Sequence, residues 1–196
     1  MQNKFVKSIF VILLIFTITS CQNSKIMELR SYGIDYLENE NYEEALNYFN
    51  EAIKMGNGEV GQVQYDLLLY KAECLFMLKR YDEAKNIYET LMSISKFNKT
   101  YKELYDNVSS INSLVDFKKY LDENNIEKAE EALQKLIDLG MEHERSVMFN
   151  QAVLYEKKAE WKDALNAFNY YLKQYPGDED AMHEVEFINA ELNNVN

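Results

Sequence analysis

The sequence is poor in the residues that interrupt regular structure, with one proline and six glycines in 196 residues. Chains built from linkers or disordered segments contain far more of both. Fifteen tyrosines and ten phenylalanines supply ring surface for packing. The composition therefore indicates an ordered body, long enough for one domain with a continuous core.

Basic residues are also scarce. Lysine and arginine number 21 against 33 aspartates and glutamates, which gives a formal net charge of −12. Binding to nucleic acid depends on basic side chains that neutralise phosphates, and binding to anionic lipid headgroups depends on basic segments. The charge therefore disfavours a nucleic-acid partner and electrostatic contact with lipid.

Groups that could carry chemistry are few. His143 and His183 lie far apart, and neither completes an HExxH or CxxC type of metal spacing. Cys74 stands mid-helix between Glu73 and Leu75, with no cationic neighbour, which favours a small buried thiol over a nucleophile. No Gly-x-Ser-x-Gly elbow is present. We expect no enzyme activity, no metal and no cofactor. An enzyme or a solute-binding lipoprotein is kept as an alternative function.

Long apolar runs are missing except at the amino end. The first twenty residues contain Lys4 and Lys7, then a predominantly apolar run from Ile9 to Ile18, and no acidic residue. Ten helical residues reach ~15 Å, about half of the hydrocarbon core of a bilayer. The run therefore predicts a signal peptide and not a spanning anchor.

The residues that follow this run are more specific. Ile18, Thr19, Ser20 and Cys21 resemble the bacterial lipobox. The resemblance implies that residues 1–20 are removed, that Cys21 carries fatty acids such as palmitate, and that residues 21–25 form a short tether. The protein would then sit on the outer side of the cytoplasmic membrane or on the outer membrane, and Cys74 would have no disulfide partner. The alternative is a plain secretory signal with a chance cysteine.

The rest of the chain repeats one helical pattern. Gly33, Tyr36, Ala45 and Phe49 fall at helical spacings on either side of a break at residues 38–41. The second half of this pattern, a large apolar residue three before an alanine and another four after it, occurs four times: Tyr42, Ala45, Phe49; Tyr81, Ala84, Tyr88; Ile126, Ala129, Leu133; Trp161, Ala164, Phe168. Small residues let helix backbones approach closely, so the pattern predicts stacked antiparallel helix pairs that form a solenoid. The alternative is an ordinary helical bundle.

The segment that contains Leu29, Gly33, Tyr36, Ala45, Phe49 and Ala52 resembles a tetratricopeptide repeat (TPR). The fourth copy resembles it through Ala152, Tyr155, Ala164, Phe168 and Pro176, and the third departs from it because Phe117 stands where a small residue is expected. The resemblance implies an all-α, right-handed α-solenoid of about four TPR-like hairpins over 26–192, with repeats at about 26–59, 65–98, 110–143 and 145–178. It also implies that the helices of the third pair are splayed or locally irregular.

Turn-forming residues set the expected helix bounds. The expected helices span 26–38, 42–55, 62–79, 81–95, 101–122, 126–139, 143–159 and 161–174. Asn39, Asn41, Asn98, Asn124, Asn125 and Gly140 mark breaks. The alanines are more than one ideal repeat apart, so we place extra residues at 56–62 and 95–101. Asp178 would cap a ninth helix, 178–192, whose apolar face would close the open end of the array. A partner-recruiting helix is the alternative for this tail.

The resemblance also implies a binding groove, lined by the first helix of each pair. The four repeated alanines place the groove positions of the family on this chain. These positions include Met27, Arg30, Ile34, Leu37, Asp66, Leu69, Glu73, Phe76, Met77, Lys118, Phe149 and Val153. Such a surface could anchor an extended or helical peptide, or its residues could pack against the array itself. It lacks the clustered lysine, asparagine and arginine of the family's carboxylate clamp, so an acidic carboxyl-terminal peptide is a poor ligand.

Together these features predict a membrane-anchored scaffold that binds a protein or peptide partner in the cell envelope. The alternative is an accessory lipoprotein in outer-membrane protein assembly or secretion, because the fourth copy looks like repeats of barrel-assembly lipoproteins.

Overall fold

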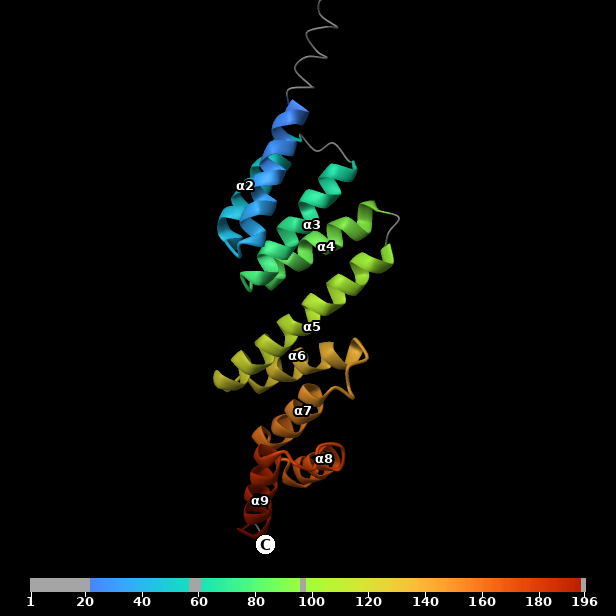
Figure 1. The fold of residues 1–196 in the computed structure, drawn as a ribbon. Coiled ribbons are helices and arrows are strands. Elements are labelled where there is room, and N and C mark those ends of the chain that lie inside the picture. Colours follow the sequence, from blue (N-terminus) through green and yellow to red (C-terminus); the bar gives the residue numbers. More distant parts are fainter. Residues whose placement is uncertain (1–21, 57–60, 96–97, 195–196) are drawn as a thin grey trace, which may run out of the picture. The chain divides into compact units, whose positions relative to one another are not determined.

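The computed structural model describes residues 22–56, 61–95 and 98–194, and within these ranges all regular structure is helical, with no strand (Figure 1). Cys21 and the predicted signal peptide lie outside the described residues. The chain divides into two compact units, Met1–Val108 and Ser109–Asn196, which are described separately below. The division falls within one helix, between the buried side chains of Val108 and Ser110.

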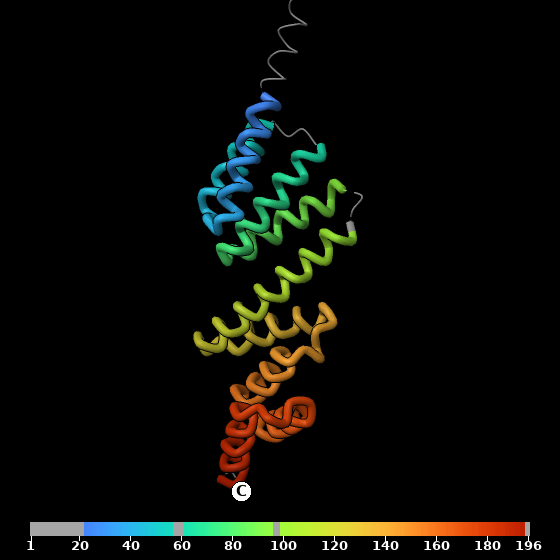
Figure 2. Tube along the Cα trace, viewed as in Figure 1, coloured from blue at the N-terminus to red at the C-terminus, as the bar shows by residue number. Residues whose placement is uncertain are grey.

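Unit 1 consists of consecutive antiparallel helices that Figure 2 traces from blue to green. They are the first helix (residues 22–38), α2 (Tyr42–Met55), α3 (Gln62–Met77), α4 (Tyr81–Ile94) and the start of α5 (Asn98–Asp122). α3 packs against both α2 and α4. One core cluster runs through the unit from Ile26 to Val108.

Unit 2 contains the rest of α5 and four further helices. They are α6 (Ile126–Asp138), α7 (Arg145–Lys157), α8 (Trp161–Gln174) and α9 (Glu179–Asn194). α7 packs against α6 and α8, and α8 packs against α9. Two core clusters result, one around Phe117 and Leu136 and one around Phe168 and Ile188. The predicted all-α fold of paired helices is therefore confirmed.

All four hairpins turn through the same backbone motif. Each turn contains one residue with positive φ, namely Glu40 (59°), Lys79 (60°), Asn124 (55°) and Ala159 (56°). The amide of the following residue donates to the carbonyl five residues earlier at 2.8–2.9 Å, in the pairs Asn41–Tyr36, Arg80–Leu75, Asn125–Tyr120 and Glu160–Tyr155. These bonds satisfy carbonyls that the end of the first helix of each pair leaves open, so backbone geometry sets the turn and glycine is not required.

The pattern of small and large residues forms the seam of each hairpin. Ala45, Ala84, Ala129 and Ala164 are all 0% exposed. At Gly33 a Cβ atom would lie 2.5 Å from Cε1 of Phe49, so only glycine leaves room for this buried ring. The sixteen-residue offset between these two positions recurs as Ala72–Tyr88, Phe117–Leu133 and Ala152–Phe168. In the first, second and fourth pairs the small residue therefore allows the backbone to approach the large ring.

The third hairpin follows the same plan despite Phe117. Phe117 is 1% exposed and shares a core cluster with Ala129, Ala132 and Leu133 of α6. Leu133 stands at the position where the other hairpins have an aromatic residue. The smaller leucine leaves volume for the ring of Phe117. Both helices are unbroken and the turn at Asn124 matches the others, so the expected local irregularity is wrong, while the splay of the pair stays a prediction.

Some expected helix bounds need correction. α5 begins at Asn98 and not at residue 101, so Asn98 is not a break and the extra residues placed at 95–101 partly lengthen this helix. α7 begins at Arg145, two residues later than expected. Residues 22–25, expected as part of a short tether, are helical, and the side-chain amide of Gln22 donates to the carbonyl of Met55.

A polar cluster of Arg145, Tyr171 and Asp178, which was not predicted from the sequence, connects the start of α9 to α7 and α8. Asp178 accepts hydrogen bonds from the Tyr171 hydroxyl at 2.5 Å and from Nη2 of Arg145 at 2.8 Å. Its other oxygen accepts from the amide of Ala181 at 3.1 Å, which makes Asp178 the cap of α9, as predicted. The bonds from Tyr171, Arg145 and Ala181 hold the pKa of Asp178 at about 2. Ala181 and Ile188, on the expected apolar face of α9, are 0% exposed.

Candidate binding groove

Most of the predicted groove residues lie on two helices of unit 1. The first helix carries Met27, Arg30, Ile34 and Leu37, and α3 carries Asp66, Leu69, Glu73, Phe76 and Met77. Nη2 of Arg30 lies 3.5 Å from Oδ2 of Asp66 and 3.5 Å from the Tyr70 hydroxyl. The guanidinium also lies over the Tyr70 ring, 5.3 Å from its centre. These contacts bring the two sets of residues to one face of unit 1, which we call the unit 1 groove.

Residues of the unit 1 groove differ in how much surface they offer. Met27 and Met77 are 47% and 45% exposed. The aliphatic and aromatic members are half-buried and pack against the core of the unit: Ile34, Leu37, Leu69 and Phe76. The groove therefore has a packed apolar floor and two flexible, exposed methionines, which can adapt to the shape of a ligand.

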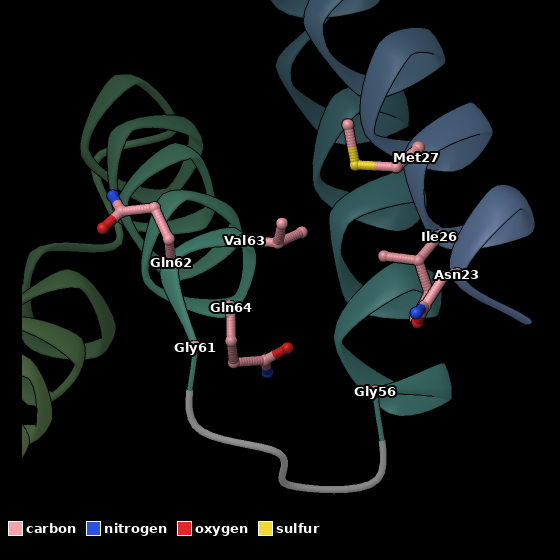
Figure 3. Close-up of a pocket in the computed structure, with 8 residues that line it drawn as sticks. All are labelled: Asn23, Ile26, Met27, Gly56, Gly61, Gln62, Val63 and Gln64. Atoms are coloured by element: carbon pink, nitrogen blue, oxygen red, sulfur yellow. The ribbon is translucent and has the colours of Figure 1, made fainter. Parts of the chain in front are cut away.

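One cavity opens beside Met27 (Figure 3). It measures about 350 Å³ and lies between the first helix and the start of α3. Figure 3 shows Met27 of the first helix and Val63 of α3 projecting into the space between the two helices. Val63 is 38% exposed and was not among the predicted groove residues.

A second cavity, the Glu73 cavity, extends the groove toward α5. It measures about 430 Å³ and is lined by Leu69, Glu73, Phe76, Tyr88, Leu104, Asn107 and Val108. Leu69, Glu73 and Phe76 were predicted, whereas Tyr88 of α4 and the three residues of α5 were not. Leu104, Asn107 and Val108 lie within the helix that was predicted from residue 101, but they precede the third repeat, and the repeat pattern did not indicate that they would face the groove.

Of the predicted groove residues of unit 2, Phe149 lines a cavity of about 460 Å³ together with Ser146 and Asp180. Lys118 on α5 is exposed, while Phe149 and Val153 on α7 are half-buried and pack against the core. The ring centre of Phe149 lies 5.5 Å from those of Phe168 and Tyr171, with edge-to-face geometry. Phe149 therefore contributes to the core of the fourth hairpin.

Catalytic and metal chemistry finds little support in the described residues. Cys74 is 0% exposed, and burial, assisted by the charge of Glu73, raises the pKa of its thiol to about 12. A reactive thiolate is therefore absent at neutral pH. Within residues 22–56, 61–95 and 98–194, no group of three or more histidine, cysteine or acidic side chains could hold a metal ion. Over the same part of the chain, no helix has the length and apolar content needed to cross a bilayer.

Comparison with known proteins identifies the repeat. Models of the tetratricopeptide repeat match residues 36–106 and 117–179, which together make up more than half of the chain. The chain belongs to the tetratricopeptide repeat family. A TPR protein from Parabacteroides merdae ATCC 43184 is a similar solved structure, 16% identical with a TM-score of 0.48, and the match covers 85% of this chain and 74% of that one.

Two further matches accompany this TPR assignment. MamA from Desulfovibrio magneticus RS-1 is 14% identical, with a TM-score of 0.42 and 86% of each chain covered. The intraflagellar transport protein 56 homolog of Caenorhabditis elegans is 37% identical over 59 residues, which are 30% of this chain. The TPR chain spans about a tenth of the length of that curated relative.

Proposed function

We propose that this TPR chain is a membrane-anchored scaffold of the cell envelope that binds a polypeptide partner along the unit 1 groove. The observation that carries the proposal is the Arg30–Asp66 contact, which joins the groove positions of the first helix and α3 into one surface. Proteins built from TPRs serve in protein–protein interactions, and this surface combines an apolar floor, two exposed methionines and two cavities. An extended or helical segment could place its side chains in these cavities in turn.

The anchor in this proposal rests on the likeness of residues 18–21 to a lipobox. Residues 22–25 are helical and rise only about 6 Å along the helix axis. A lipid on Cys21 would therefore hold the first helix, and the groove that begins at Met27, close to the membrane surface. Partners anchored in or emerging from that membrane would meet the groove first.

We expect Met77→Glu to reduce capture of the partner at least tenfold, because it places a charge on the exposed apolar rim of the groove. The full chain, solubilised in detergent, would be used to capture proteins from envelope extract. Ile94→Glu is the matched control, since Ile94 is 43% exposed on α4 and lies outside the groove. Phe76 and Phe149 are unsuitable probes because both pack edge-on against rings, Phe76 against Tyr81. Equal capture by Met77→Glu and the unchanged chain would remove the groove from the proposal.

For the anchor, we expect Cys21→Ser to abolish incorporation of labelled palmitate in a bacterial host and to release the protein from the membrane fraction. Loss of the acyl chains removes the apolar area that holds the protein to the bilayer. Cys74→Ser should keep the label, because Cys74 is buried in the folded chain. Label retained on Cys21→Ser would contradict lipidation at this position.

A further inference from the structure

The Glu73 cavity combines apolar walls with a single carboxylate. Tyr88 and Val108 at its base are 5% and 3% exposed, and Leu69, Phe76 and Leu104 complete the apolar lining. Glu73, itself exposed, is the one acidic side chain among the lining residues. A ligand group that fills this cavity therefore meets rings, aliphatic side chains, the polar side chain of Asn107 and one negative charge.

The charge of Glu73 has no counterion in the described part of the chain. The ion pairs of unit 1 involve other carboxylates, for example Arg30 with Asp66, Arg80 with Glu83 and Lys102 with Asp106. Burial raises the pKa of Tyr88, and the negative charge of Glu73 adds to this effect. The carboxylate therefore acts on the interior of the cavity.

The same chain twice surrounds an arginine with a carboxylate and a tyrosine ring. Arg30 contacts Asp66 and lies 5.3 Å from the centre of the Tyr70 ring. Arg145 lies 2.8 Å from Asp178 and 5.3 Å from the centre of the Tyr175 ring. In both places the ring face and the carboxylate stabilise one planar cation. Glu73 and Tyr88 repeat this combination beside an open cavity.

We propose that the Glu73 cavity receives an arginine side chain of the partner polypeptide, with its aliphatic stem along Leu69 and Leu104 and its guanidinium beside Glu73 and the Tyr88 ring. This assignment rests on the proposed function and names the chemistry of the partner at one point of the groove. The net charge of −12 further favours a partner with basic residues.

Other side chains suit the cavity less well. A leucine or phenylalanine would fill the apolar part but would remove water from the Glu73 carboxylate without giving it a partner, which is unfavourable. An acidic side chain would be repelled. A lysine would satisfy the charge, but its ammonium group cannot stack flat on a ring or bind a carboxylate through two parallel hydrogen bonds.

The test uses two small probes, N-acetyl-arginine methylamide and the matching citrulline compound, which has the same shape and a neutral end group. Each is titrated into the full chain in detergent micelles, and binding is followed by NMR through the methyl groups of Leu69, Leu104 and Val108. We expect the arginine probe to bind about tenfold more tightly than the citrulline probe and to shift these methyl signals. Equal affinities, or shifts confined to other methyl groups, would overturn the assignment.

Two variants complete the test. Glu73→Gln should lower the affinity for the arginine probe to that for citrulline, while Glu89→Gln, the same change at an exposed position of α4, should leave it unchanged. An unaltered preference for arginine in Glu73→Gln would rule out the proposed contact. If the arginine probe fails to bind while Met77→Glu still blocks capture of the partner, the groove stands and only the arginine assignment falls.

Discussion

Gly33→Ala is expected to destabilise unit 1 by about 2 kcal/mol, although alanine is the better helix former by about 1 kcal/mol. The added Cβ would lie 2.5 Å from Cε1 and 2.8 Å from Cζ of Phe49. This ring is 0% exposed and stacks on Tyr70 with centres 5.2 Å apart, so it has no room to move aside. Urea unfolding followed by circular dichroism would measure the loss.

The same replacement should change sign when the ring is removed. In a Phe49→Leu background, which places at residue 49 the leucine found at the equivalent position 133, Gly33→Ala should stabilise by up to about 1 kcal/mol. Gly177→Ala is the control, because no other atom of the described chain lies within 4 Å of its added Cβ, and we expect a change below about 0.5 kcal/mol. An equal effect of Gly33→Ala in both backgrounds would show that Phe49 does not require the glycine.

Phe168→Ala should cost about 3–5 kcal/mol, the range typical of a fully buried phenylalanine truncated to alanine. Phe168 is 0% exposed and contacts Phe149 edge-on, with ring centres 5.5 Å apart. Phe168→Leu should cost only about 1 kcal/mol, because leucine restores most of the volume. Chemical denaturation monitored at the α8 and α9 resonances by NMR would report the change in unit 2.

Tyr170→Ala provides the matched comparison on the same helix. Tyr170 is 52% exposed, so removal of its ring should change stability by less than about 0.5 kcal/mol. Similar losses for Phe168→Ala and Tyr170→Ala would mean that the seam position has no special role in the core.

The sequence predicted the hairpins well because their packing depends on residue size at fixed spacing. The alanines at 45, 84, 129 and 164 are all buried, as their register required. The third hairpin was misjudged because Phe117 was considered alone, whereas the space it fills depends on Leu133, sixteen residues later. Prediction from a repeat pattern therefore improves when facing positions are read as pairs.

The candidate site was predictable only in part. Groove positions on the first helix and α3 follow from the repeat, but the pairing of Arg30 with Asp66 depends on how the arginine side chain reaches a carboxylate of a different hairpin. The α5 residues of the Glu73 cavity precede the third repeat, so the repeat pattern assigns them no groove position. The Arg145–Tyr171–Asp178 cluster likewise joins residues up to 33 positions apart, beyond the reach of local patterns.

The backbone conformation of the shared hairpin turn limits the thermal stability of the chain. Glu40, Lys79 and Ala159 occupy a left-handed backbone conformation that disfavours side chains by roughly 1–2 kcal/mol each, and glycine would relieve that strain. The natural chain is therefore less stable to heat than its architecture permits, and glycine at these three turn positions should raise its melting temperature.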